Sequence, residues 1–203
     1  MEALAFSMLS HFQFHTLTTF FFMIIIANPS LATRLEPQLK SNVDFVKTSC
    51  QVTMYPDICY KTLSTYASTI QTSPRELANA ALSVSLKAAQ STSNLVMKLS
   101  KEHGLKPGEA VAIADCVDTM GDCVEELQQS MSAMKDLQGP EFQMKMSNMQ
   151  TWVSAALTNE DTCMDGIEEK ARNGKFKDTI RSNIARVAQL TSNALAFINK
   201  LSY

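Results

Sequence analysis

Glycine and proline are scarce in this 203-residue chain, with six of each. A fold rich in turns, or a chain without stable structure, is typically richer in both residues. The helix-forming residues Ala, Leu, Met, Gln, Lys and Glu recur through the middle and the end of the chain. The composition therefore favours an all-α protein, and the length suits one domain with a sizeable core.

Residues and motifs of catalytic sites are equally sparse. Two of the three histidines, His11 and His15, lie near the N-terminus, and His103 stands alone at the end of a predicted helix. The sequence contains no glycine-rich phosphate loop, no H-E-x-x-H and no G-x-S-x-G motif. Cys116 and Cys123 lack the C-x-x-C spacing of a metal site. We therefore expect no enzyme, no metal and no cofactor, but a protein that acts by binding another protein.

Long apolar runs are missing as well, except near the N-terminus. Residues 17–27, LTTFFFMIIIA, have the length of a signal-peptide core and are too short to span a bilayer. Ser30-Leu31-Ala32 offers a cleavage site, although the residues before the run include no Lys or Arg. We predict a signal peptide over 1–32, a short leader over 33–41 and a secreted protein, with an uncleaved anchor as the alternative. The net charge of −2 predicts neither nucleic acid nor a membrane surface as a partner.

Four amphipathic segments follow, separated by breaks at glycine or proline. Ser73-Pro74-Arg75-Glu76 and Pro107 mark helix starts. A bend or pause is expected around residues 158–162 of the third helix. Apolar spacing of three and four residues predicts these core positions: Leu77, Ala81, Val84, Ala88, Ser91, Leu95, Leu99, Ile113, Val117, Met120, Val124, Leu127, Met131, Met134, Met146, Met149, Val153, Ala156, Ile180, Ile184, Val187, Thr191, Ala194, Ile198 and Leu201.

A shorter helical unit is predicted ahead of these segments. Cys50 and Cys59 flank Tyr55-Pro56-Asp57, where the proline breaks a helix. The simplest interpretation is a helical hairpin over 42–70, closed by Cys50–Cys59. Together with residues 73–203 this predicts an all-α fold: an up-down-up-down four-helix bundle preceded by an N-terminal helical hairpin and stapled by disulfides. A longer coiled coil is the alternative, and the breaks disfavour it.

The remaining cysteines are constrained by helix geometry. Cys116 and Cys123 are separated by about 10 Å along one helix, beyond the reach of a disulfide. One of them is therefore expected to pair with Cys163 on the following helix. The cysteine left over is either buried and inert, which we favour, or forms an intermolecular link.

The helix that begins at Pro107 has an unbalanced charge. Between residues 107 and 134 there is no Lys or Arg, and Asp118, Asp122 and Glu125 fall on the side away from the predicted core. A solvated outer face is one interpretation. Like charges one turn apart repel, however, and a solvated helix usually mixes the two signs. The alternative is a face that binds a basic or polar partner surface.

Taken together, several segments resemble the plant invertase/pectin methylesterase inhibitor family. The resemblance extends from about residue 42 to the C-terminus, in the order found in the family, and the combination is more specific than any one segment. The segments are Cys50-x8-Cys59 with Tyr55-Pro56, ADCVD at 114–118, QTWVSAALT at 150–158, DTCMDG at 161–166 and LTSNALA at 190–196.

The resemblance implies a secreted protein of the plant cell wall, or apoplast, with a hairpin and a four-helix bundle. It implies disulfides Cys50–Cys59 and Cys116–Cys163, and Cys123 departs from the family pattern. It also implies that the target enzyme is contacted by the acidic face and by residues beside the last disulfide cysteine. By position these target-binding residues are Asp118, Asp122, Glu125, Thr162 and Asp165.

The resemblance leaves two target enzymes to distinguish. Invertase inhibitors of the family tend to carry Pro-Lys-Phe before the third bundle helix, and here the residues are Pro140-Glu141-Phe142. A glutamate there would repel the carboxylates of a glycosidase site. We therefore expect a 1:1 complex with a pectin methylesterase, bound over its substrate cleft. The alternatives are an acid invertase inhibitor and a helical carrier of a small hydrophobic ligand.

Overall fold

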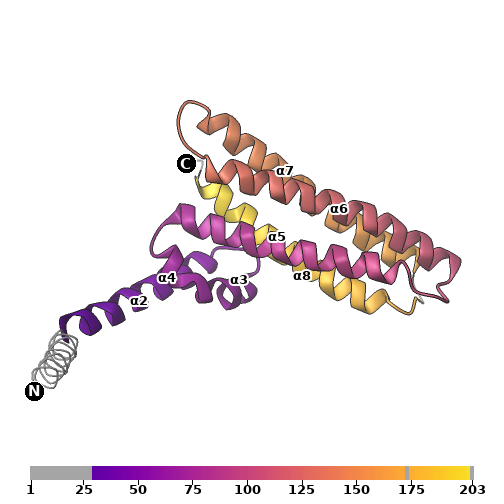
Figure 1. The fold of residues 1–203 in the computed structure, drawn as a ribbon, viewed down its shortest axis with the longest axis horizontal. Coiled ribbons are helices and arrows are strands. Elements are labelled where there is room, and N and C mark those ends of the chain that lie inside the picture. Colours follow the sequence, from indigo (N-terminus) through magenta and orange to yellow (C-terminus); the bar gives the residue numbers. More distant parts are fainter. Residues whose placement is uncertain (1–28, 172–173, 202–203) are drawn as a thin grey trace, which may run out of the picture. The chain divides into compact units, whose positions relative to one another are not determined.

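The structure is a computed structural model that describes residues 29–171 and 174–201. Every regular element within these residues is helical (Figure 1). Most of the predicted signal peptide, residues 1–28, lies outside the described residues, and its end and the predicted leader fall within the first helix. The helices are α2 (Pro29–Cys50), α3 (Pro56–Leu63), the short 3₁₀ helix η1 (Ser64–Tyr66), α4 (Ala67–Ile70), α5 (Pro74–Leu99), α6 (Pro107–Lys135), α7 (Phe142–Lys170) and α8 (Lys177–Leu201).

The chain divides into two compact units, Met1–Ser41 and Asn42–Tyr203. In the first unit the described residues are the beginning of α2, and residues 36–41 are exposed. The second unit contains the end of α2, the short helices that follow it and the four long helices. Within the described residues, no helix combines the length and the apolar character that crossing a membrane requires.

The four long helices form the bundle that the sequence predicts. α5 and α7 each pack against both α6 and α8, so each helix has two neighbours in a closed ring. Consecutive helices run in opposite directions, which is the up-down-up-down arrangement (Figure 1). α6 and α7 have 29 residues each, which corresponds to about 43 Å of helix. The two longest helices therefore lie side by side over most of the bundle.

The helix ends follow the local signals in the sequence. At the start of α5 the Ser73 side chain accepts a hydrogen bond from the Glu76 backbone N–H at 3.3 Å. Pro74 and Pro107 occupy the first turns of α5 and α6, where a missing N–H costs nothing. Gly104 and Gly139 have φ of 81° and 76°, a conformation that favours glycine, and each lies in the chain between two long helices.

The core largely follows the predicted apolar positions. Along α7 all four predicted positions are buried, and along α8 burial extends from Ile180 to Ile198. On α6 the predicted positions divide between buried residues such as Met120 and half-buried ones such as Val124. Each of these helices therefore directs one apolar face inward, as its periodicity indicates.

On α5 the predicted core face is displaced by about one residue. Ser91, a predicted core residue, is exposed, and Val84, Ala88 and Leu95 are half-buried. The physical reason is that α5 packs against α6, α8 and the short helices α3 and α4, so its buried face is wide. The buried residues of α5 are Leu77, Ala78, Ala81, Leu82, Ser85, Ala89, Thr92, Val96 and Leu99.

The expected interruption of the third bundle helix is absent, because α7 continues from Phe142 to Lys170. Two threonines in this segment satisfy their hydroxyls within the helix. Thr158 donates to the Ser154 carbonyl at 3.2 Å, and Thr162 donates to the Thr158 carbonyl at 2.7 Å. A side chain that bonds the carbonyl one turn earlier can be accommodated without ending the helix.

The hairpin is fastened to the bundle by a buried asparagine. A disulfide joins Cys50 to Cys59 across the break at Pro56, with 5.6 Å between their Cα atoms. The Asn193 side chain on α8 accepts from the Tyr55 N–H at 3.2 Å and donates to the Tyr55 carbonyl at 3.0 Å. One buried amide thus satisfies both backbone groups of the residue before the proline.

Replacing Asn193 with alanine should lower the free energy of unfolding by about 1–3 kcal/mol, because it leaves the Tyr55 N–H without its partner and the Tyr55 carbonyl with only the Cys59 N–H. Denaturant unfolding of the disulfide-intact protein measures this change. Ser182→Ala is the control, since Ser182 is exposed and bonds only a carbonyl of its own helix in the described structure. Equal stability of the two variants would show that the asparagine does not hold the hairpin.

Candidate functional site

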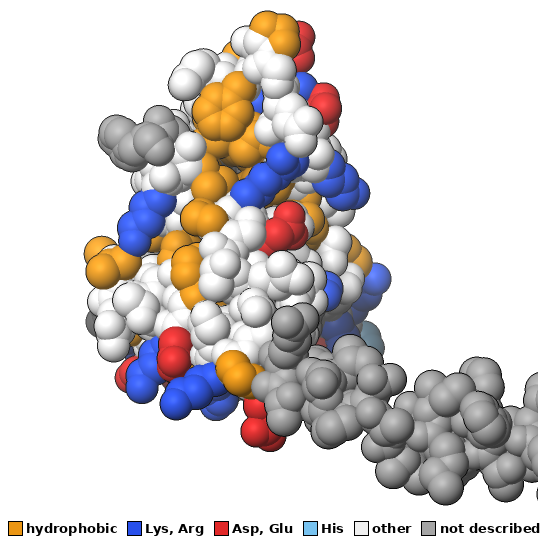
Figure 2. All heavy atoms as spheres, turned by 90° about the vertical axis from the view of Figure 1, so that its left-hand side faces the viewer, with side chains coloured by type: hydrophobic (Ala, Val, Ile, Leu, Met, Phe, Trp, Pro, Cys, Tyr) orange, Lys and Arg blue, Asp and Glu red, His pale blue; other side chains and the backbone are white. Residues whose placement is uncertain are grey.

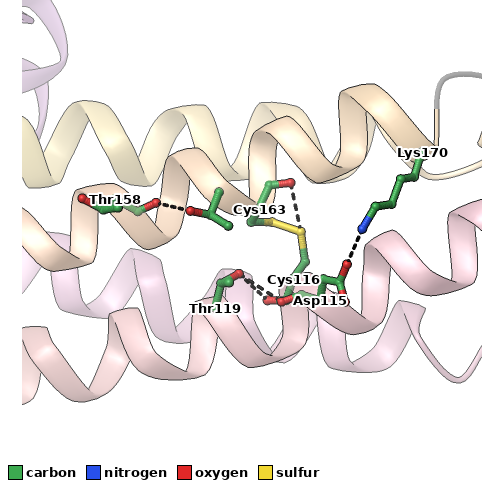
Figure 3. Close-up of a disulfide and its surroundings, with 7 residues drawn as sticks. Asp115, Cys116, Thr119, Thr158, Cys163 and Lys170 are labelled. Atoms are coloured by element: carbon green, nitrogen blue, oxygen red, sulfur yellow. Dashed lines mark hydrogen bonds and ion pairs between the residues drawn. A yellow bond between two sulfur atoms is a disulfide. The ribbon is translucent and has the colours of Figure 1, made fainter.

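The candidate site lies on the paired helices α6 and α7. A buried disulfide joins Cys116 to Cys163, with 4.7 Å between their Cα atoms (Figure 3). Near the disulfide, Lys170 extends across from α7 and its Nζ lies 2.8 Å from a carboxylate oxygen of Asp115 on α6 (Figure 3). These links fix α6 against α7, so that the outer faces of the two helices form one continuous surface.

The α6 part of this surface is an acidic ridge, which we define as Asp118, Asp122 and Glu125. All three side chains are exposed. None of the salt bridges among the described residues includes them. Glu125 accepts a hydrogen bond from the Gln129 side chain at 3.3 Å, which leaves its charge in place. The ridge therefore presents three carboxylates whose repulsion is not offset by an ion pair in this part of the chain.

The crowding of carboxylates affects the neighbouring Glu126. Partial burial raises the pKa of Glu126, and the hydrogen bond that Asn159 of α7 donates to it at 3.0 Å opposes the rise. The charges of Asp122 and Glu125 add to the increase in pKa. Burial is thus the main cause of the raised pKa of Glu126, and the ridge carboxylates contribute less.

The α7 part of the predicted site lies on either side of the disulfide cysteine. Thr162 and Asp165 are exposed and lie three residues apart, which places them on one face of α7, while Cys163 points inward. The Thr162 hydroxyl already donates to the Thr158 carbonyl, so its oxygen faces a partner mainly as an acceptor. The five predicted residues therefore belong to the outer faces of two adjoining helices.

An open groove of about 640 Å³ continues from the ridge toward the end of α6. Glu125 lines the groove together with Trp152, which is half-buried. Met144 also lines it and is 55% exposed. Sequence reasoning missed this groove, because its lining combines the faces of two helices, α6 and α7, and the periodicity of each helix does not show how the two faces meet. The remaining lining residues are Gln128, Gln129, Ser132, Ala133, Asp136, Lys145 and Asn148.

The end of the bundle where α6 ends and α7 begins carries charges of both signs. Figure 2 faces this end and shows a line of hydrophobic side chains between Lys and Arg side chains. Lys135, Lys145 and Lys200 lie near this end, in the last turn of α6, the beginning of α7 and the last turn of α8. Lys145 pairs with Asp136 and with Glu141, and the latter contact is 3.3 Å. The carboxylates of Asp136 and Glu141 are therefore paired with a lysine, whereas those of the ridge are not.

The leftover cysteine, Cys123, is free and fully buried on α6. Burial, together with the nearby Glu160 and Glu126, raises its pKa well above the usual value of a thiol, so it remains protonated and unreactive. Among the described residues, no cluster of His, Cys, Asp and Glu could hold a metal ion. The groups present on this surface are exposed carboxylates, hydroxyl oxygens and a groove with an aromatic side chain.

The fold defines a class of disulfide-stapled helical bundles. The sequence profile of the plant invertase/pectin methylesterase inhibitor family matches residues 44–197. The chain belongs to this family.

Relatives with assigned names support the inhibitor branch concerned with pectin. The chain is 41% identical to pectinesterase inhibitor 9 of Arabidopsis thaliana over 191 residues, which cover 91% of this chain and 94% of the relative. Pectinesterase inhibitor 10 of the same plant is 47% identical over 163 residues, 79% of this chain and 52% of the relative. The 21 kDa protein of Daucus carota is 45% identical over 161 residues, 78% of this chain and 83% of the relative.

A solved structure supports the fold independently. The crystal structure of a mutant form of a pectin methylesterase inhibitor from Arabidopsis matches with a TM-score of 0.62. The match covers 74% of this chain and 92% of the other, at 23% sequence identity. At that identity the match supports the helical-bundle fold, and nothing finer.

Peptide mapping under non-reducing conditions should recover Cys50 joined to Cys59 and Cys116 joined to Cys163. Cys123 should react with an alkylating reagent only after denaturation, because it is buried and protonated in the folded protein. Cys123→Ser should cost little stability, since serine can donate the same hydrogen bond to Glu160. A Cys123–Cys163 linkage would contradict this disulfide assignment while leaving the helical fold intact.

Proposed function

We propose that this protein is a secreted, non-catalytic inhibitor of a plant cell-wall pectin methylesterase. It forms a 1:1 complex in which the α6–α7 surface covers the substrate cleft of the enzyme. The observation that carries this proposal is the acidic ridge, three exposed carboxylates without an ion pair among the described residues. Family membership and the names of the relatives agree with it.

The charge of the ridge fits the chemistry of the enzyme's substrate. Pectin becomes a polyanion as its methyl esters are removed, so a cleft that processes it accommodates rows of carboxylates. Asp118, Asp122 and Glu125 repeat carboxylates along one face of a rigid helix, and they can occupy the same cleft. Complementary charge of this kind accelerates association and sets the orientation of the complex.

The groove beside the ridge supplies the apolar part of the interface. Stable protein interfaces combine a central apolar or aromatic anchor with a polar rim. Trp152 is half-buried at the groove and Met144 is exposed there, next to the carboxylate of Glu125. A side chain of the enzyme placed in the groove would bury apolar surface while the ridge contacts the cleft.

The position that distinguishes the two possible targets carries the wrong charge for invertase. Glu141 is exposed immediately before α7 and its carboxylate lies 3.3 Å from Lys145, so this lysine is engaged locally. A glycosidase site contains carboxylates, which Glu141 would repel. The same residue is compatible with a cleft that binds a polyanion.

The mature protein should therefore inhibit a purified pectin methylesterase and leave an acid invertase largely active. Both enzymes are assayed with increasing inhibitor at one ionic strength, and the amount needed for complete inhibition gives the stoichiometry. Inhibition of invertase alone would refute the proposed target, and a plateau at two inhibitors per enzyme would refute the 1:1 complex.

Neutralising the ridge with Asp118→Asn and Asp122→Asn should weaken the complex by about 1–3 kcal/mol, or roughly 5- to 150-fold. Added salt should weaken the wild-type complex more than the double variant, because screening acts on the charges that remain. The dissociation constant is measured by calorimetry at several salt concentrations.

The matched control is Asp44→Asn with Glu102→Gln, which removes the same charge from two exposed acidic residues outside α6 and α7. Thermal unfolding should be unchanged in both double variants, or slightly improved in the ridge variant as repulsion is relieved. Equal affinities of the ridge variant and the control at every salt concentration would show that the ridge is only a solvated face.

A further inference from the structure

A buried polar layer crosses the centre of the bundle with one residue from each long helix. Ser85 of α5, Cys123 of α6, Glu160 of α7 and Thr191 of α8 are all 0% exposed. They are connected, since Ser85 and Thr191 hydroxyls lie 2.7 Å apart and Thr191 and Cys123 both bond Glu160. A fully buried glutamate is rare in a protein that does not use it as a ligand or an ion-pair partner.

The carboxyl of Glu160 is only partly satisfied. Its Oε1 lies 2.8 Å from the Thr191 hydroxyl oxygen and 3.3 Å from the Cys123 sulfur, whereas Oε2 is buried without a hydrogen-bond partner. None of the salt bridges among the described residues includes Glu160. A charged carboxylate with one bare oxygen in a protein interior is far more costly than a neutral carboxylic acid.

Counting hydroxyl hydrogens also favours the neutral acid. Thr191 has one hydroxyl hydrogen but two acceptors within reach, the Val187 carbonyl at 3.0 Å and Glu160 Oε1 at 2.8 Å. If Glu160 carries a proton on Oε1, it donates to Thr191, and the Thr191 hydrogen goes to Val187. Ser85 then donates to the second lone pair of Thr191. All hydroxyl hydrogens are used, and the oxygen left without a partner is an uncharged carbonyl.

Each of the four long helices contributes a titratable or hydroxyl group near Glu160. α6 contributes the thiol of Cys123 and the carboxylate of Glu126, and α7 contributes Asp161. α5 and α8 contribute the hydroxyls of Ser85 and Thr191. The pKa of Glu160 is raised from 4.5 to about 7, mainly by burial. The hydrogen bonds with Thr191 and Cys123 oppose this rise, and the charges of Asp161 and Glu126 add to it.

We propose that Glu160 is a pH sensor in the core of the bundle: as a neutral acid it links the four helices, and its ionisation at higher pH destabilises the fold. The inhibitor is therefore most stable in an acidic compartment and loses stability as the pH approaches neutrality. This property belongs to the isolated protein and is independent of which enzyme it binds.

The direction of the effect follows from proton linkage. The folded protein holds the Glu160 proton more tightly than the unfolded chain, whose glutamate has the ordinary pKa of 4.5. The stabilisation is complete below pH 4.5, falls between pH 4.5 and about 7, and is constant above that range. Over this interval the folded-to-unfolded ratio should fall by roughly 300-fold from this group alone.

The test compares denaturant unfolding of the wild type and Glu160→Gln from pH 4 to pH 8.5, with disulfides intact. The amide cannot ionise, so the variant should lack most of the 300-fold fall that the wild type shows. Glu169→Gln, an exposed residue of the same helix, is the matched control and should retain the wild-type pH profile. Identical pH profiles for all three proteins would overturn the proposal.

A second measurement needs no variant and covers the case in which Glu160→Gln does not fold. The carboxyl carbon of Glu160 is followed by nuclear magnetic resonance in the folded wild-type protein during a pH titration. A midpoint near 7 supports the proposal, and a midpoint below about 5.5 overturns it. Because neither experiment uses an esterase, a failure here leaves the proposed inhibition untouched, and a failure of inhibition leaves the pH sensor untouched.

Discussion

The fixed pairing of α6 with α7 is the constraint on which the proposed recognition surface depends. The Cys116–Cys163 disulfide closes a segment of the chain with a sequence separation of 47 residues. In the chain-entropy description, closing a loop of this length removes about 4 kcal/mol of freedom from the unfolded state. The Lys170–Asp115 pair and the Asn159–Glu126 hydrogen bond add polar links between the same helices. Without this pairing, the ridge and the residues around Cys163 would be two separate surfaces.

The bundle combines an apolar core with one polar layer that links all four helices. Buried polar groups contribute little net stability compared with well-packed apolar ones. They do require particular partners, and Glu160 finds its partners only when α6 and α8 are in this register. The Asn193–Tyr55 contact has the same character at the hairpin. Apolar stripes thus supply most of the driving force, and a few buried polar contacts specify which arrangement of the helices is formed.

Most of the architecture could be predicted from the sequence, because it depends on local rules. Pro74 and Pro107 mark helix starts, Gly104 and Gly139 mark turns, and the apolar period of α7 and α8 identifies the buried face. The errors arose where a helix contacts more than two elements, as in α5. They also arose where a side chain satisfies itself within its own helix, as Thr162 does. The apolar period of a helix identifies one buried face. It does not show how many other helices pack against that helix.

The sequence by itself determined the all-α class, the four-helix order and the exposed carboxylates of α6, since these depend on spacing along one chain segment. Helix geometry left open whether Cys116 or Cys123 pairs with Cys163, and the family resemblance, not the spacing, indicated Cys116. The tertiary structure alone placed Glu160 in the core. In the sequence Glu160 sits in the polar run Asn159-Glu160-Asp161, which indicates a solvated surface. Whether Glu160 is buried depends on which residues of the other three helices pack around it, and the local sequence pattern does not contain that information.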